Sequence, residues 1–247
     1  MPDVSVVVPC HNHGRYIRDC LHSLVGGPTS LGMMAGQTTD AFEVIVVDDA
    51  STDDSWAHIV AAWRACKARS PVPVYVIRLE RNVGTAAALN HGLRAAVGEY
   101  VTPLHADDMA EPWHLARHLE EAAPDRFVYG DLRIFAYGQR AGVWEVGHWD
   151  YERAKRANPA HAGILFARDA WVRTGGYPES LGDGREDWAM VLRLGAHGYE
   201  GRHIQAATYL YRREDQGRSG YNHSPAQRLA FRRKVEAALP EVFDASG

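Results

Sequence analysis

The sequence predicts an α/β protein with a Rossmann-like, mostly parallel central sheet flanked by helices and a mixed second half. Over the first 135 residues, apolar strands alternate with segments whose apolar residues recur with a helical period. The strands are almost wholly apolar, which is typical of parallel strands covered on both faces. Polar clusters follow four of these strands, and ligands bind at the carboxyl ends of strands in such sheets. These observations predict both the fold class and the edge of the sheet that carries a site.

The first half of the chain predicts four strands, at residues 4–9, 42–47, 74–79 and 99–104. Between them, helices are expected at 16–25, after a cap at Ser51 or Thr52, and at 85–96. Residues 26–40 are rich in Gly and Thr and are expected to form a loop or insertion. Residues 109–112 predict a turn that leads into a helix near Pro112.

The second half is less regular and predicts a mixed or antiparallel sheet. Strands are expected at 127–135, 141–146 and 207–212, with a short strand after residue 161. Helices are expected at 168–173, from 185 to 194 and at 225–239. We therefore divide the chain into residues 1–110, residues 111–215, which share the same core, and a C-terminal lid and helix at 216–247.

The composition is that of an ordinary globular protein and argues against some classes of function. The 247 residues carry a net charge of −4, so we expect no nucleic-acid partner. No apolar run approaches the roughly 20 residues needed to span a bilayer, and we expect no signal peptide before the first strand. The three cysteines lack a C-x-x-C spacing, as expected for reduced thiols in a cytoplasmic protein. The oligomeric state does not follow from the sequence.

The stretch "LHADDM" places Asp107 and Asp108 at the end of the fourth strand, with His105 just before them. Mg²⁺ and Mn²⁺ take oxygen ligands, and Mg²⁺ usually binds one or two carboxylates plus substrate phosphates. Two aspartates therefore suit a metal shared with a phosphorylated ligand. Capping of the next helix explains the same pair equally well when the motif is taken alone.

Asp48 and Asp49 follow the second strand, where an acidic residue can hydrogen-bond a sugar hydroxyl or a base N–H. Helix capping is the alternative, but "ASTDDS" supplies capping residues further on, and this favours ligand binding. No G-x-G-x-x-G follows the first strand, where Pro9, His11 and Asn12 stand, so nicotinamide chemistry is disfavoured.

Two later segments are rich in charge. Glu186 and Asp187 open a helix, where a carboxylate that faces a pocket could act as general base or could complement the positive helix N-terminus. The basic stretch "YRREDQGRSGY" at 211–221 could be a lid whose arginines meet phosphates, or a solvated face.

Six stretches, taken in order, resemble the family 2 inverting glycosyltransferases of the glycosyltransferase A fold. They are "VSVVVPCHN", "FEVIVVDDASTD", "RNVGTAAALNHGL", "GEYVTPLHADD", "GILFARDAWVRTGGYPES" and "GREDWAMVLRL". Most are loose alone, but six in the expected order are specific, and together they cover roughly residues 3–212.

The resemblance implies that residues 1–110 bind a nucleotide-sugar donor, most commonly a UDP-sugar, and that 111–215 hold a hydroxyl-bearing acceptor. The nucleotide base pocket would be lined by Pro9, His11, Asp48 and Asp49. Other donor contacts would come from Asn12, Asn82 and Gly84. His11 stands where the family usually has tyrosine.

For the cation and the chemistry, the resemblance implies that Asp108 ligates Mn²⁺ or Mg²⁺ on the diphosphate. Asp107 would face the ribose or the donor sugar, and Arg212 or Arg213 would approach the phosphates. Asp187 would be the catalytic base, with Glu186 beside it touching donor or acceptor. His105 stands where many members have an aspartate, which is a departure from the family's DXD-like motif.

The implied reaction is a single displacement that inverts the anomeric centre, as in polysaccharide or glycoconjugate biosynthesis. Two other functions remain as alternatives. The first is a non-catalytic sugar-nucleotide or glycan-binding protein on the same fold, which a degraded metal or base motif would favour. The second is a nucleotidyltransferase, which would need a basic, glycine-rich loop that "CHNHGRY" does not supply.

Overall fold

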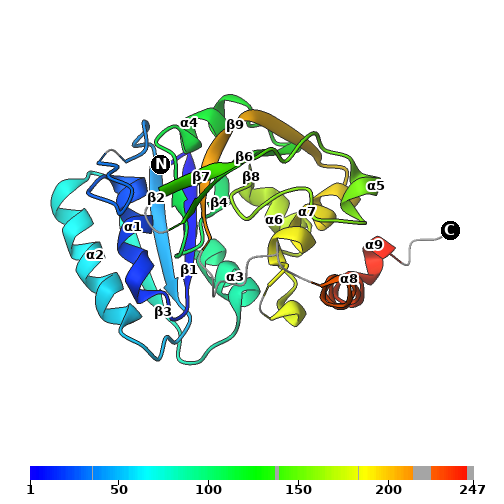
Figure 1. The fold of residues 1–247 in the computed structure, drawn as a ribbon, viewed down its shortest axis with the longest axis horizontal. Helices are drawn as coiled ribbons and strands as arrows, with labels where there is room; N and C mark the ends of the chain where they lie inside the picture. Colours follow the sequence, from blue (N-terminus) through cyan, green and yellow to red (C-terminus); the bar gives the residue numbers. More distant parts are fainter. Residues whose placement is uncertain (35, 137–138, 183, 214–223, 244–247) are drawn as a thin grey trace.

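The computed structural model describes residues 1–34, 36–136, 139–182, 184–213 and 224–243 (Figure 1). Within these residues, nine strands form one sheet in the order β3-β2-β1-β4-β8-β6-β9-β5, with β7 paired to β6. Helices flank the sheet, so the predicted α/β class is confirmed.

The first half of the chain builds the parallel part of the sheet. β1 (Val4–Cys10) lies between β2 (Phe42–Asp48) and β4 (Tyr100–Pro103), and β3 (Val74–Arg78) forms the edge. β1 pairs in parallel with β2 and β4, and β2 pairs in parallel with β3. Because these strands run the same way, the segments that follow them emerge at one edge of the sheet.

Alternating side chains of these strands pack against two layers of helices. Val6 and Val8 share a buried cluster with residues of α1 (Gly14–Val25) and α2 (Ser55–Arg69). Val7 belongs to the other cluster, with residues of α3 (Thr85–Ala95). The helices α1 and α2 accordingly lie on one side of β1 and α3 on the other (Figure 1). Strands buried on both faces explain why the sequence shows no polar alternation there.

The second half of the chain adds the mixed part of the sheet. β8 (Leu165–Ala167) pairs antiparallel with both β4 and β6 (Arg126–Ala136). β6 pairs in parallel with β9 (Glu200–Arg212) and antiparallel with β7 (Gln139–Trp144), and β9 pairs antiparallel with β5 (Met109–Ala110). The remaining helices are α4 (His114–Glu120), α5 (Tyr151–Ala154), α6 (Arg168–Arg173), α7 (Glu186–Ala196), α8 (Pro225–Ala238) and α9 (Pro240–Phe243), with a 3-10 turn η1 (Glu179–Leu181).

Residues from both halves of the chain pack together in one of the buried clusters. It contains Val7 and Ile45 from the parallel strands, Phe127 from β6, Trp188 from α7 and Leu239 near the C-terminus. The segments before and after β5 therefore share a core. This places the start of α7 against the same sheet that the first half builds.

Three local predictions are wrong. Residues 109–110 form a strand rather than a turn, because Met109 and Ala110 pair with β9 far along the chain. α2 begins at Ser55 and has no side-chain cap, since the hydroxyl of Ser51 accepts a hydrogen bond from the Asn12 backbone instead. β9 starts at residue 200 rather than 207, because pairing with β6 recruits a polar stretch that has no apolar run of its own.

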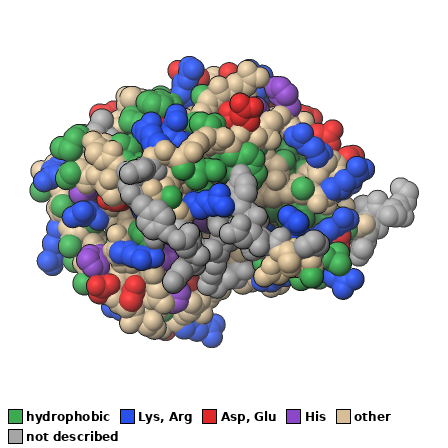
Figure 2. Space-filling model, in the orientation of Figure 1, with side chains coloured by type: hydrophobic (Ala, Val, Ile, Leu, Met, Phe, Trp, Pro, Cys, Tyr) green, Lys and Arg blue, Asp and Glu red, His purple; other side chains and the backbone are tan. Residues whose placement is uncertain are grey.

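The surface carries mixed charge. Lys and Arg side chains stand among acidic and apolar side chains on the face shown in Figure 2. In the described part of the chain, no helix combines the length and the apolar character that crossing a membrane requires.

Candidate active site

Segments that follow β1, β2 and β3 meet at one edge of the sheet and form the strand-end frame, defined as His11, Asn12, Asp49, Asn82 and Gly84. Asp49 is at its centre and is only 3% exposed. Its Oδ1 accepts a hydrogen bond from the Val83 N–H (2.8 Å) and its Oδ2 accepts one from the Gly84 N–H (2.9 Å). The carboxylate therefore holds the turn that leads into α3.

His11 and Asn12 tie the end of β1 into this frame. His11 Nδ1 lies 2.7 Å from the Asp49 carbonyl oxygen, and its Nε2 lies 2.9 Å from Asn82 Nδ2. Asn12 Oδ1 accepts a hydrogen bond from the Thr52 N–H (2.9 Å). Asn12 Nδ2 also lies 3.1 Å from His11 Nε2, so three neighbours fix the orientation of the imidazole.

Pro9 and Asp48 lie within the strands rather than beyond them. Pro9 is buried in β1 opposite Val47. Asp48 is fully buried, and its Oδ1 accepts a hydrogen bond from the Ser51 N–H (3.2 Å). Its Oδ2 lies 3.3 Å from Arg78 Nε of β3. Asp48 therefore shapes the turn after β2.

Backbone strain is concentrated at this edge. Among the described residues, the non-glycine residues with positive φ are Asn12 (58°), Ala50 (51°) and Arg185 (72°). Such conformations cost about 1–3 kcal/mol each and are typical of functional sites. Gly84 has a φ of 86°, and a Cβ there would lie 3.0 Å from the Gly182 carbonyl carbon. The segment before α7 therefore packs directly on the frame.

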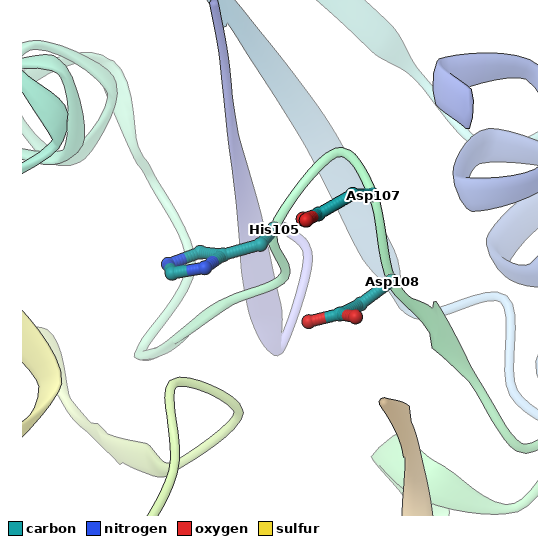
Figure 3. A group of neighbouring side chains, drawn as sticks. All are labelled: His105, Asp107 and Asp108. Atoms are coloured by element: carbon teal, nitrogen blue, oxygen red, sulfur yellow. The ribbon is translucent and has the colours of Figure 1, made fainter. Parts of the chain in front are cut away.

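The loop between β4 and β5 contributes His105, Asp107 and Asp108. Figure 3 shows the three side chains projecting from this loop toward the same side. One ligand atom from each lies within 4.8 Å of the others. Together with Glu186 and Asp187 at the start of α7, we call these residues the acidic cluster.

Asp108 is buried beneath the loop. Its Oδ2 accepts a hydrogen bond from the Tyr209 hydroxyl (2.7 Å), and its Oδ1 accepts one from the Arg212 N–H (2.8 Å). Burial and the neighbouring Asp107 raise the pKa of Asp108. Asp107 is more open, with its side chain 36% exposed, and its Oδ1 lies 3.7 Å from His13 Nδ1. Asp107 is therefore the carboxylate that a ligand reaches first.

Arg212 fastens the end of β9 to the same loop. Its Nε donates a hydrogen bond to the Asp107 carbonyl oxygen (2.6 Å), and its guanidinium carbon lies 4.4 Å from the Tyr16 ring centroid and 4.5 Å from that of Phe135. The side chain that sequence reasoning assigned to the phosphates is thus packed between two aromatic rings. Arg213 donates its N–H to the Phe135 carbonyl oxygen. Residues 214–221 of the predicted lid lie outside the described residues.

His105 connects the loop to α7. Its Nε2 lies 3.2 Å from Glu186 Oε1, and the Glu186 side chain is 5% exposed. Burial lowers the pKa of His105, but the contact with Glu186 and the charges of Asp107 and Asp108 outweigh it and raise that pKa to about 9. The histidine and the residue next to the predicted base are therefore in direct contact.

Asp187 lies one residue further along α7. Its Oδ2 accepts a hydrogen bond from Asn158 Nδ2 (2.8 Å), and its Oδ1 accepts one from the Trp188 N–H (2.7 Å). Burial and the adjacent Glu186 raise the pKa of Asp187 to about 6. A carboxylate with a pKa near neutrality is suited to take a proton from an acceptor hydroxyl.

Sequence reasoning missed three residues of the site: His13, Asn158 and Tyr209. Asn158 stands in "RANPAH", where nothing marks it as a partner of Asp187. Tyr209 lies inside an apolar strand pattern and is indistinguishable from a core residue in the sequence. Only His13, beside the noted "CHN" stretch, carries a signal that proximity to a motif could have found.

The donor set of His105, Asp107 and Asp108 suits a divalent cation. It offers two carboxylates and one imidazole, which are ligands of Mn²⁺ and related ions. Both oxygens of Asp108 already accept one protein hydrogen bond, but an ionised carboxylate has about four acceptor positions. These residues therefore fit a cation bound between the loop and a phosphorylated ligand.

Comparison with known families agrees with this geometry. Residues 5–172, more than half of the chain, match the family described as "Glycosyl transferase family 2". The chain belongs to glycosyl transferase family 2. The matched residues include the strand-end frame, the loop of the acidic cluster and Asn158, but not α7.

Individual relatives extend the likeness beyond that region. The chain is 26% identical over 219 residues to chondroitin synthase from Escherichia coli, which is 85% of this chain and 29% of that protein. It spans less than half the length of several such curated relatives.

Solved structures share the fold. S. aureus TarS 1–349 in complex with UDP-GlcNAc has a TM-score of 0.72 and 20% identity, covering 100% of this chain and 68% of that chain. A mannosyltransferase from Pyrobaculum calidifontis, in complex with GDP-Man and Mn²⁺, has a TM-score of 0.63 and 20% identity, covering 100% of this chain and 76% of that one. The fold of this family 2 chain is therefore the glycosyltransferase A fold.

Proposed function

We propose that the protein is an inverting glycosyltransferase that moves a sugar from a nucleotide-diphosphate sugar to a hydroxyl acceptor. The observation that carries the proposal is the contact between His105 and Glu186. It places the candidate cation group and the candidate base, Asp187, on two segments in direct contact. A donor whose diphosphate lies at the loop would then have its sugar within reach of the start of α7.

The strand-end frame is the proposed nucleotide site. His11 presents an imidazole whose two nitrogens are engaged by Asp49 and Asn82, and this leaves the face of the ring for stacking on a base. The proposal favours a uridine nucleotide, because TarS with a similar fold binds UDP-GlcNAc. Asp107, the open carboxylate, would face the diphosphate.

A divalent cation, Mn²⁺ or Mg²⁺, bound by the loop would neutralise negative charge on the diphosphate. Candidate ligands are His105, Asp107 and Asp108. The proposal adds Asp107 and His105 to the ligand set that the family resemblance assigned to Asp108 alone. Arg212 positions this loop rather than contacting phosphate, since its guanidinium is packed between Tyr16 and Phe135.

Asp187 is the proposed general base. Its carboxylate removes the proton from the acceptor hydroxyl while the hydroxyl oxygen bonds to the anomeric carbon. The bond from that carbon to the diphosphate oxygen breaks, and the nucleoside diphosphate leaves with the electron pair. Attack from the face opposite the leaving group inverts the anomeric centre. Asn158 holds the Asp187 carboxylate in orientation.

The test is Asp187→Asn, assayed with a UDP-sugar and Mn²⁺. Transfer should fall by about 10²- to 10⁴-fold, while donor binding measured by calorimetry stays unchanged, because only the proton acceptor is lost. Asp169→Asn, at an exposed carboxylate of α6, is the matched control and should leave transfer unchanged. Full transfer by Asp187→Asn would contradict the base assignment.

The same assay separates the alternatives. Donor binding without transfer to any of a panel of hydroxyl acceptors would favour a non-catalytic binding protein. Pyrophosphate release from a nucleoside triphosphate and a sugar phosphate would identify a nucleotidyltransferase.

A further inference from the structure

His105 introduces a nitrogen donor into a group that otherwise offers only carboxylates. One ligand atom each of His105, Asp107 and Asp108 lies within 4.8 Å of the others, so a single ion could contact all three after small adjustments. In Figure 3 the imidazole ring projects to the same side as the two carboxylates. The imidazole ring is therefore positioned to bind the same ion as the two carboxylates.

The contact with Glu186 decides which ring nitrogen is left for a ligand. His105 Nε2 lies 3.2 Å from Glu186 Oε1, and Glu186 is almost fully buried at the start of α7. A cation that binds Nδ1 displaces the proton that the imidazolium carries there and leaves Nε2–H facing this carboxylate. Metal-binding histidines commonly donate their other ring N–H to a carboxylate, which fixes the tautomer and increases the basicity of the ligating nitrogen.

We propose that His105 is a ligand of the cation at the donor site, through Nδ1, and that the site therefore prefers Mn²⁺ to Mg²⁺. Imidazole suits first-row transition metals, whereas Mg²⁺ binds oxygen ligands and water in near-ideal octahedral geometry. The inference rests on the proposed function for the presence of a cation. It goes further by assigning the ligand that sets the choice of metal.

Glu186 is a positioning residue in this arrangement. It acts on the cation through the imidazole, while Asp187 beside it faces the acceptor. The chain of contacts runs from the loop through His105 to the first turn of α7. Cation binding therefore fixes the start of the helix that carries the proposed base.

His13 is the alternative source of a nitrogen ligand and supplies the matched control. Its Nδ1 lies 3.7 Å from Asp107 Oδ1, so it stands beside the same carboxylate. Unlike His105, it is absent from the group whose ligand atoms converge within 4.8 Å. A measurement that shows which of these two imidazoles binds the cation tests the geometry directly.

The direct test is pulsed electron paramagnetic resonance of the full chain with Mn²⁺ and UDP. The spectrum should show coupling to ¹⁴N, which changes to ¹⁵N coupling when the histidines are labelled. The coupling should disappear in His105→Asp and persist in His13→Asn. Bound Mn²⁺ without nitrogen coupling, or coupling lost only in His13→Asn, would overturn the inference.

Calorimetry with UDP present gives the second measurement. The ratio of Mn²⁺ to Mg²⁺ affinity should fall at least about 10-fold in His105→Asp, which restores an all-oxygen ligand set. Glu186→Gln should weaken Mn²⁺ binding by about 10- to 100-fold, as loss of an outer-shell partner does. An unchanged ratio in His105→Asp would sink this inference alone. Absence of UDP-dependent cation binding, together with absence of transfer, would instead sink the proposed function.

Discussion

The strand-end frame and the acidic cluster both bury carboxylates at one edge of the sheet, but they use them differently. In the frame, both oxygens of Asp49 accept hydrogen bonds from backbone N–H groups of a single turn. In the acidic cluster, Asp107 lies beside Asp108 and Glu186 beside Asp187, and burial with a like charge raises the pKa of Asp108 and Asp187.

The difference separates carboxylates that fix the backbone from carboxylates that can bind a cation or a proton. A carboxylate whose two oxygens both hold the backbone of one turn fixes the shape of that turn. Two adjacent carboxylates repel each other, so binding of a cation or a proton stabilises the pair. The frame is therefore suited to hold a nucleotide in place, and the acidic cluster is suited to bind a metal and to move a proton.

The largest expected effect comes from breaking the frame. Asp49→Ala removes two hydrogen bonds to a buried carboxylate: the Val83 N–H loses its acceptor, and the Gly84 N–H keeps only Asn82 Oδ1 (3.0 Å). The free energy of unfolding should therefore fall by about 4 kcal/mol. Urea denaturation measures this change. Asp54→Ala, at a side chain that is 72% exposed, should change stability by less than about 0.5 kcal/mol. A loss below about 1 kcal/mol in Asp49→Ala would show that the frame does not depend on this carboxylate.

Buried imidazoles beneath the acidic cluster should make the second half of the fold sensitive to acid. Burial lowers the pKa of His118 from 6.5 to about 4 and that of His161 to about 3. Since the unfolded chain binds more protons between pH 4 and 6.5, stability should fall as pH falls through this window, by about 3 kcal/mol for His118. Unfolding free energies across pH measure the slope.

His118→Gln is the variant that sharpens this prediction. It should flatten the slope between pH 4 and 6.5, whereas His58→Gln, at an exposed histidine of α2, should leave it unchanged. Equal slopes in all three proteins would contradict the assignment.

Tyr209→Phe tests how far one hydroxyl stabilises the loop of the acidic cluster without affecting the strand-end frame. It removes the hydroxyl that donates to Asp108 Oδ2 and accepts from the His105 N–H, while the frame keeps every contact described above. The free energy of unfolding should fall by about 2 kcal/mol, as for a hydrogen bond to a charged group. Thermal unfolding measures the loss, and no change would mean that Asp108 is held by the Arg212 backbone alone.

Asn158→Ala should have the smallest effect, and the effect should be on the pH dependence of the transfer rate. Asn158 donates to the charged form of Asp187, so its loss should raise the pKa of that carboxyl above about 6. Because a base must be deprotonated, the acidic limb of the transfer rate should move to higher pH, with about a 10-fold loss of rate near pH 6. A pH profile of kcat identical to that of the wild type would contradict the orienting role of Asn158.

The parallel half of the fold follows directly from local sequence. Apolar runs such as "FEVIVV" have no polar alternation, and only a strand covered on both faces accommodates them. Since parallel strands end at the same edge, the neighbourhood of Asp49 and Asn82 also follows from the pattern. The roles within the frame do not, because whether a carboxylate binds a ligand or a backbone N–H depends on where a turn 34 residues away is placed.

The acidic cluster shows what only the tertiary structure decided. Sequence alone determined that Asp107, Asp108, Glu186 and Asp187 stand at the ends of elements, and the order of motifs determined the family. The contacts of His105 with Glu186, Asp187 with Asn158 and Asp108 with Tyr209 join residues between 29 and 101 positions apart. Such pairs leave no local pattern, because they depend on how the mixed strands and α7 pack against the parallel sheet. The same packing sets the burial that shifts the pKa of these groups, and through it their chemistry.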